Sequence, residues 1–166
     1  MTGASLASWN GFFTVSAGAS ATLVGLLFVS LSVNIREILK YHHLPTRAAA
    51  TLGSLMLILV ASLAFLAPQP RWAMALEVLA ASLMAWIQHV RSAMRARAAQ
   101  ATYGRPVHEG WMELAMGQAM SAPFIVGAGL MLAGSNAALA ILAAGVILAF
   151  ALSVLNAWVL LVEILR

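Results

Sequence analysis

The sequence predicts an all-α protein, a polytopic bundle of five transmembrane helices. Of its 166 residues, 63% are apolar and only 8% are charged, and the mean hydropathy is +0.94. A soluble domain usually carries about 25% charged residues, because its surface must be hydrated. Nine Lys and Arg and five Glu cannot hydrate a surface of this size. The chain is therefore predicted to lie in a lipid bilayer.

Five apolar runs are long enough to cross a ~30 Å hydrocarbon core, which takes roughly 20 helical residues. The predicted helices cover residues 12–33, 48–68, 72–90, 114–133 and 137–162. They form a single transmembrane domain over residues 1–166, and residues 96–110 are expected to be the only sizeable loop. Residues 1–35 carry no charge, so no basic region precedes the first apolar run, and this segment is expected to stay in the mature protein.

The last two helices come from one run, because the 49 residues from Leu114 to Val162 carry no charge. This run is too long for one crossing, and residues 133–136 (Ala-Gly-Ser-Asn) are the best turn within it. Pro123 lies inside the fourth predicted helix. It should kink that helix, because proline cannot donate a hydrogen bond to the Ala119 carbonyl.

The basic residues predict the orientation. Arg71 lies between the second and third helices, whereas the other eight fall on the opposite side of the membrane in the five-helix arrangement: Arg36, Lys40, Arg47, Arg91, Arg95, Arg97, Arg105 and Arg166. The positive-inside rule makes that side cytoplasmic. The N-terminus is then outside and the C-terminus is in the cytoplasm.

Composition and motifs also exclude several classes of function. The calculated pI near 10.8 comes from an excess of four charges in loops, so no nucleic-acid partner is expected. Without cysteine, disulfides, iron–sulfur clusters and thiolate metal sites are excluded. The pairs His42-His43 and His108-Glu109 lack zinc-site spacing. No catalytic set, phosphate loop or dinucleotide motif is present, so neither a metal, a cofactor nor an enzyme activity is expected.

The first helix carries a stripe of small residues, in which Gly11, Gly18 and Gly25 recur every seven residues. Small residues let transmembrane helices approach closely. The stripe therefore indicates either packing within the chain or contact between subunits.

The opposite side of this helix is polar, with two leucines among the polar residues: Ser16, Ser20, Leu23, Leu27, Ser30 and Asn34. One interpretation is a solvated path with Leu23 and Leu27 as an apolar constriction. In the other, each serine bonds the carbonyl four residues earlier in its own helix. Because neither face suits lipid, the helix is expected to lie centrally in the bundle.

Two further polar features lie inside the predicted spans. Glu77 is the acidic residue well within a span, and such carboxylates usually face a cavity or the bundle interior. The alternative interpretation is that the Glu77 carboxyl lies near the membrane–water interface, where it is protonated or paired with Arg71. Toward the basic side lies a polar cluster: Asn34, Gln88, His89, Glu113, Gln118, Asn156 and Glu163. Interhelical hydrogen bonds of about 0.6–2 kcal/mol each would hold the bundle together there, and His89 near Glu113 could instead carry protons.

Residues 21–34 (ATLVGLLFVSLSVN) and 156–164 (NAWVLLVEI) resemble the two ends of a bacterial family of small multi-pass membrane proteins with no assigned activity. The resemblance implies a bacterial cytoplasmic (inner) membrane protein. The expected function is a homo-oligomeric channel or small transport protein that passes an ion or small solute along the first helix. The alternative is a non-catalytic accessory or assembly protein that binds another membrane protein or lipid.

Overall fold

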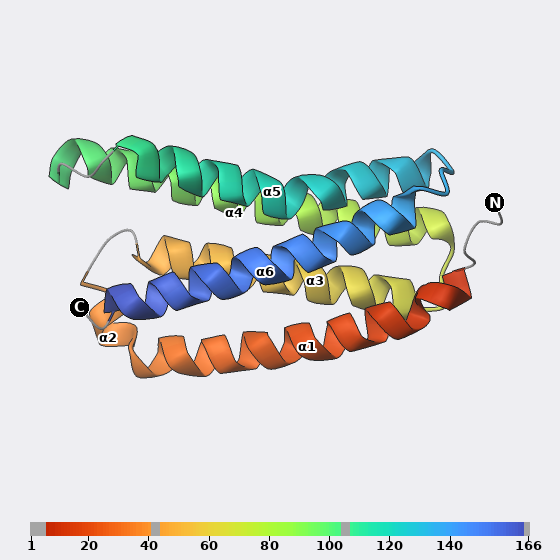
Figure 1. Cartoon of the computed structure of the whole chain (residues 1–166), viewed down its shortest axis with the longest axis horizontal. Coiled ribbons are helices and arrows are strands. Elements are labelled where there is room, and N and C mark those ends of the chain that lie inside the picture. Colours follow the sequence, from red (N-terminus) through yellow and green to blue (C-terminus); the bar gives the residue numbers. More distant parts are fainter. Residues whose placement is uncertain (1–5, 41–43, 104–106, 165–166) are drawn as a thin grey trace.

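The computed structural model describes residues 6–40, 44–103 and 107–164, apart from the side chains of residues 6, 7, 96, 99–103, 107–109, 163 and 164. Within these ranges the protein contains helices and no strand. The helices are α1 (Leu6–Val33), α2 (Ile35–Ile38), α3 (Leu44–Leu66), α4 (Arg71–Tyr103), α5 (Val107–Leu132) and α6 (Ala138–Ile164). Figure 1 shows the five long helices side by side in an elongated bundle.

The prediction of an all-α protein with five long apolar helices is confirmed. In the part of the chain that the structure describes, five helices are long and apolar enough to cross a membrane: Ser8–Val33, Leu44–Leu66, Arg71–Arg95, Gly110–Leu132 and Ala138–Val162. α3 contacts α1, α4 and α6, while α5 packs between α4 and α6. Large apolar side chains such as Ile58, Val78, Phe124 and Leu142 fill the shared core.

The predicted loop over residues 96–110 is wrong, because α4 continues to Tyr103 and α5 already begins at Val107. The segment Met94–Gln100 (MRARAAQ) is rich in alanine and arginine. Both residues favour helix, so the chain stays helical after its apolar span ends. The α4–α5 hairpin consequently reaches further than the ends of α1, α3 and α6 (Figure 1).

The predicted turn between the last two helices is confirmed. α5 ends at Leu132 and α6 begins at Ala138, and Gly134 has a φ of 75°. Glycine adopts this left-handed conformation without strain, and a glycine there commonly ends a helix. The Ser135 amide donates to the Leu130 carbonyl at 2.9 Å, which satisfies a carbonyl of the last turn.

The expectation that the first helix lies centrally is wrong. In its most apolar stretch 28% of the α1 residues are buried, against 56% in α3. α1 packs on α3 and makes only slight contact with α6. α3 is the central helix, because small residues such as Ser54, Ala61 and Ser62 let neighbouring helices approach several of its sides.

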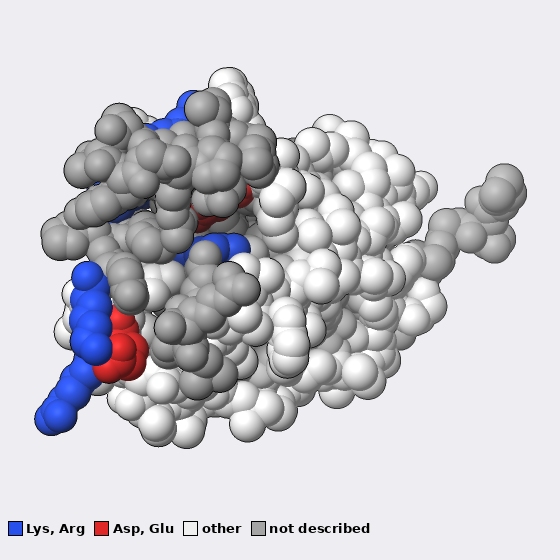
Figure 2. Space-filling view, turned by 60° about the vertical axis from the view of Figure 1, so that its left-hand side comes forward, with Lys and Arg blue, Asp and Glu red and all other residues white. Residues whose placement is uncertain are grey.

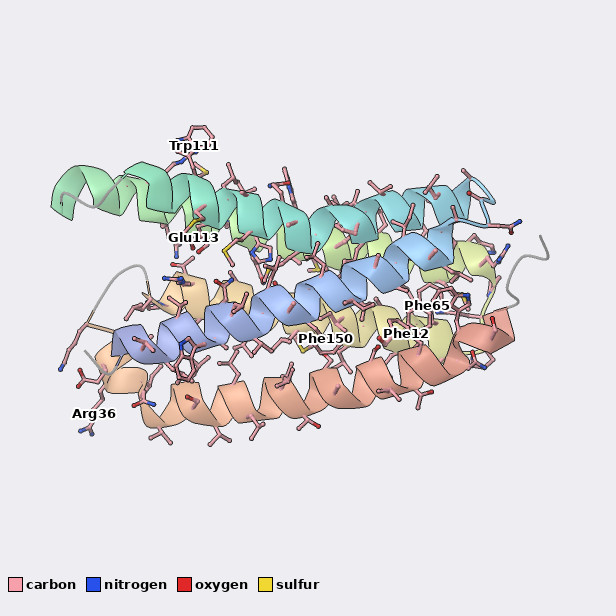
Figure 3. The ribbon with its side chains drawn as sticks, in the orientation of Figure 1. Phe12, Arg36, Phe65, Trp111, Glu113 and Phe150 are labelled. Carbon is pink, nitrogen blue, oxygen red and sulfur yellow. The ribbon has the colours of Figure 1, made fainter. Side chains whose placement is uncertain are left out.

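The two ends of the bundle differ in chemistry. At the end where α1, α4 and α6 finish lie the described basic residues other than Arg71: Arg36, Lys40, Arg47, Arg91, Arg95 and Arg97. Figure 2 turns this end forward and shows Lys, Arg and Glu atoms gathered on it, while the side of the bundle at the right is white. We call it the basic end. At the opposite end Phe13 stacks on Phe65 with ring centroids 4.3 Å apart, beside the Phe12 ring (Figure 3).

Candidate functional site

A buried polar site joins three helices around His89 of α4. The His89 side chain is 5% exposed, and its Nε2 lies 2.8 Å from the Oγ of Ser54 on α3, with a direction that depends on the histidine tautomer. The same Oγ lies 3.1 Å from the Ala50 carbonyl and 3.3 Å from the Sδ of Met120 on α5. This arrangement places an imidazole, a hydroxyl and a thioether together in the apolar span.

Gly117 makes room for this imidazole. A Cβ atom added to Gly117 would lie 2.6 Å from the His89 Cβ and 2.9 Å from its Cγ. These contacts are shorter than atoms tolerate, so α4 and α5 can approach this closely only with glycine at position 117. The amide end of the exposed Gln88 side chain lies against Gly53 of α3.

A second polar layer lies closer to the basic end, where Ser92 donates a hydrogen bond to Oε1 of Glu113. Glu113 points into the space between the helices, and Trp111 points outward from α5 (Figure 3). The Arg97 guanidinium lies 3.9 Å from the centre of the Trp111 ring. Across α3 and α4, Nη1 of Arg95 donates to the Thr46 hydroxyl at 3.1 Å. Each contact spans two helices, so this layer ties α3, α4 and α5 together near their charged ends.

The structure brings only part of the predicted polar cluster together. His89, Glu113 and Gln118 belong to the α4–α5 interface, and Gln118 accepts a hydrogen bond from the Trp86 indole at 2.9 Å. Asn34 instead donates to the Ser30 carbonyl of its own helix end at 2.9 Å. Asn156 is half-buried on α6, and the Glu163 side chain lies outside the described residues. The partner of His89 is Ser54, and Glu113 bonds to Ser92.

Sequence reasoning missed Ser54, Ser92 and Met120. A buried histidine needs a hydrogen-bond partner, so small polar residues of the neighbouring spans were the available signal. Several serines satisfy that description, and helical spacing alone does not show which of them faces α4.

The polar side of α1 faces α3. Ser16, Ser20 and Leu27 are buried, and Leu23, Ser30 and Asn34 are half-buried. The Ser20 hydroxyl donates to the Leu55 carbonyl of α3. This serine therefore forms an interhelical hydrogen bond and does not bond the carbonyl four residues earlier in its own helix.

The glycine stripe lies on the other, exposed side of α1. Gly11, Gly18 and Gly25 are exposed, and a Cβ atom added to any of them would meet no described atom within 4 Å. Hydroxyl groups on this side bond within the helix, from Thr22 to the Gly18 carbonyl at 2.9 Å and from Ser32 to the Phe28 carbonyl at 2.8 Å. We call this surface, formed by Gly11, Thr14, Gly18, Thr22, Gly25 and Ser32, the glycine face.

Glu77 is exposed near the opposite end of the bundle. Its Oε2 accepts a hydrogen bond from Nε2 of Gln69 at 2.8 Å, and the same Nε2 lies 3.0 Å from the Ala64 carbonyl. Gln69, and not the Arg71 of the alternative interpretation, is the partner seen here. The carboxylate thereby holds the α3–α4 connection against the start of α4.

The chemistry available at these sites is hydrogen bonding and helix packing. Among the side chains that the structure describes, no three His, Asp or Glu residues come together as metal ligands. Comparison of the chain with family models, with curated proteins and with solved structures gave no match. The resemblance to a bacterial membrane family stays a prediction.

Proposed function

We propose that this chain is a non-catalytic assembly protein of the bacterial cytoplasmic membrane, which binds a transmembrane helix through the glycine face of α1. The observation that supports this is the contrast among its glycines. Gly117, Gly127 and Gly145 lie against side chains of a neighbouring helix, whereas Gly11, Gly18 and Gly25 have open space beside them. Transmembrane helices associate by packing small residues together, because lipid supplies no hydrophobic drive.

The surroundings of the glycine face favour a helix as its partner. α1 is the least buried of the five spans, so its outer side is free to receive another helix. The hydroxyls of Thr22 and Ser32 already bond carbonyls of α1. They can therefore enter an apolar interface without losing a partner.

The proposed partner is a second copy of this chain, which makes the protein a homo-oligomer, and a helix of another membrane protein is the alternative. The positive-inside rule puts the basic end in the cytoplasm and the N-terminus outside. Single cysteines test this orientation directly, because the chain has none of its own. A cysteine at Ser135 should react with an impermeant thiol reagent on intact spheroplasts, and one at Ala101 only after permeabilisation.

Mass measurement in nanodiscs and mild detergents tests the assembly. The wild-type protein should contain more than one copy, and Gly18→Leu or Gly25→Leu should lower the mass by filling the glycine face. Ala19→Leu is the matched control, because Ala19 is exposed on α1 about 100° away from Gly18. Monomeric wild-type protein in every medium, with no partner retained from native membrane, contradicts the proposal.

A homo-oligomeric channel is a second candidate, favoured by the hydroxyls on the glycine face. Copies of α1 grouped around a common axis would turn Thr14, Thr22 and Ser32 toward one another. The path first expected, along Ser16 and Ser20, is the side that packs on α3. Liposome flux separates the candidates, because an assembly protein adds no cation, anion or proton leak above lipid alone.

Two substitutions sharpen the flux experiment if a leak is observed. Glu77→Gln should lower cation flux only if the path opens beside the α3–α4 connection, where this charge lies. Leu23→Ser should raise flux only if the path follows the α3-facing side of α1. An unchanged flux in Leu23→Ser protein with a measurable wild-type leak places the path elsewhere.

A further inference from the structure

An apolar groove of about 490 Å³ opens between the ends of α1 and α3 and the short helix α2. Its lining is apolar except for Ser32, whose hydroxyl already bonds the Phe28 carbonyl. The lining residues are Phe28, Leu31, Ser32, Ile35, Ile38, Pro45, Ala48, Ala49 and Leu52. A groove of this composition accepts a flexible hydrocarbon, and the hydroxyl of its one polar side chain already has a partner.

The groove lies at the basic end, and charged side chains continue from its walls. Arg36 directly follows Ile35, which lines the groove, and Arg36 points away from the bundle at this end (Figure 3). Lys40 lies two residues after Ile38 and pairs with Glu37 at 2.7 Å, with both side chains largely exposed. Among the described side chains next to the opening, Arg36 and Lys40 are two cations and Glu37 is one carboxylate.

We propose that the groove holds an acyl chain of an anionic phospholipid, whose phosphate is bound by Arg36 and Lys40. An apolar cavity continuous with exposed cations matches the two halves of such a lipid, an apolar tail and a negatively charged headgroup. Basic residues beside a membrane attract anionic lipid, and the groove adds walls from three helices around one chain. This site is separate from the assembly proposed for the glycine face, although Ser32 borders both.

The experiment compares phosphatidylglycerol with phosphatidylcholine carrying identical acyl chains, counted per protein chain by native mass spectrometry after release from mixed nanodiscs. Phosphatidylglycerol should be retained at one per chain and preferred over phosphatidylcholine. Arg36→Gln and Lys40→Gln should each lower that preference about fivefold, the effect of one basic residue at an anionic membrane surface. Arg71→Gln, at the opposite end of the bundle, should leave the preference unchanged.

A substitution that fills the groove tests the acyl-chain half of the site. Ala49 is exposed and lines the groove, so Ala49→Phe should block retention of both lipids. Ala115→Phe is the matched control, because Ala115 is an exposed alanine near the same end of α5. The two charge substitutions lie on exposed side chains and keep the test valid if Ala49→Phe protein does not fold.

Equal retention of the two lipids by the wild-type protein overturns the proposal, as does undiminished phosphatidylglycerol in folded Ala49→Phe protein. A fall in oligomer mass in Ala49→Phe protein, with phosphatidylglycerol still bound, would make the groove a subunit contact and would also overturn it. Gly18→Leu should change the mass and leave lipid retention intact. Loss of assembly and loss of the lipid site are thereby distinguishable.

Discussion

The described glycines of α1 and several glycines of the α3–α6 body have opposite surroundings. In the body, a Cβ atom on Gly127 would lie 2.5 Å from Leu142 Cγ, and one on Gly145 would lie 2.8 Å from Pro123 Cβ. On α1, the seven-residue glycine stripe has open space beside it. The three-glycine repeat of α1 thus lies on the exposed surface, whereas Gly117, Gly127 and Gly145 lie in close contacts between helices.

This difference shows that glycine spacing does not by itself locate an internal interface. A repeat keeps small residues on one side of one helix, but the neighbour's shape decides whether that side is used. Gly110 lies seven residues before Gly117 on α5 and is buried as well, so a glycine repeat can also lie inside the bundle. Gly117 leaves room for the His89 side chain.

The largest effect is expected at Gly117, where Gly117→Ala forces a Cβ into the His89 side chain. Overpacking of this kind typically costs roughly 1–3 kcal/mol. Thermal unfolding in detergent should show the loss. Gly129→Ala is the control on the same helix, because Gly129 is exposed and a Cβ there meets no described atom within 4 Å. Equal unfolding temperatures for the two proteins would refute the close α4–α5 contact.

A smaller loss is expected from Ser54→Ala, which removes the hydroxyl bonded to His89. Hydrogen bonds between transmembrane helices contribute about 0.6–2 kcal/mol, and the imidazole would be left without this partner. Denaturant or thermal unfolding measures the change. Ser32→Ala removes a hydroxyl that bonds only within α1 and should change stability much less. The reverse order of the two effects would mean that the His89 site does not hold the helices together.

The smallest effect on folding is expected for Gly18→Ala, because the added methyl group meets open space. Exposed substitutions usually stay within about 0.5 kcal/mol. The unfolding temperature of dilute monomer in detergent should therefore match that of the wild type. Gly18→Cys sharpens the same comparison, because two copies joined at this face should crosslink under oxidation, whereas Ala19→Cys protein should not.

Much of the fold was predictable because it follows from which segments of the chain prefer lipid to water. Apolar run length determined the five spans, and Gly134 with Ser135 identified the turn between α5 and α6. The helical extension beyond the α4 span was not predicted, because apolar run length gives the end of a span only. Arginine and alanine favour helix in water as well, so loss of hydropathy marked the end of the span and not the end of the helix.

The candidate site was predictable only in part. His89 and Glu113 were selected because polar groups inside a span need partners, yet their contacts with Ser54 and Ser92 were not foreseen. The proton-carrier interpretation placed His89 near Glu113. The hydrogen-bond partner of each residue is a serine on a neighbouring helix. Proton movement through these two polar layers stays a prediction.

The sequence by itself determined the number of spans, the gathering of basic residues at one end and the two-sided character of α1. These properties follow from hydropathy and from the helical period, and both can be read from one segment of the chain without its neighbours. The tertiary structure decided that α3 and not α1 is central, that Ser54 faces His89, and that the α1 glycines stay exposed. Each of those outcomes depends on how closely two helices approach, and that distance is set by small and large residues far apart in the chain.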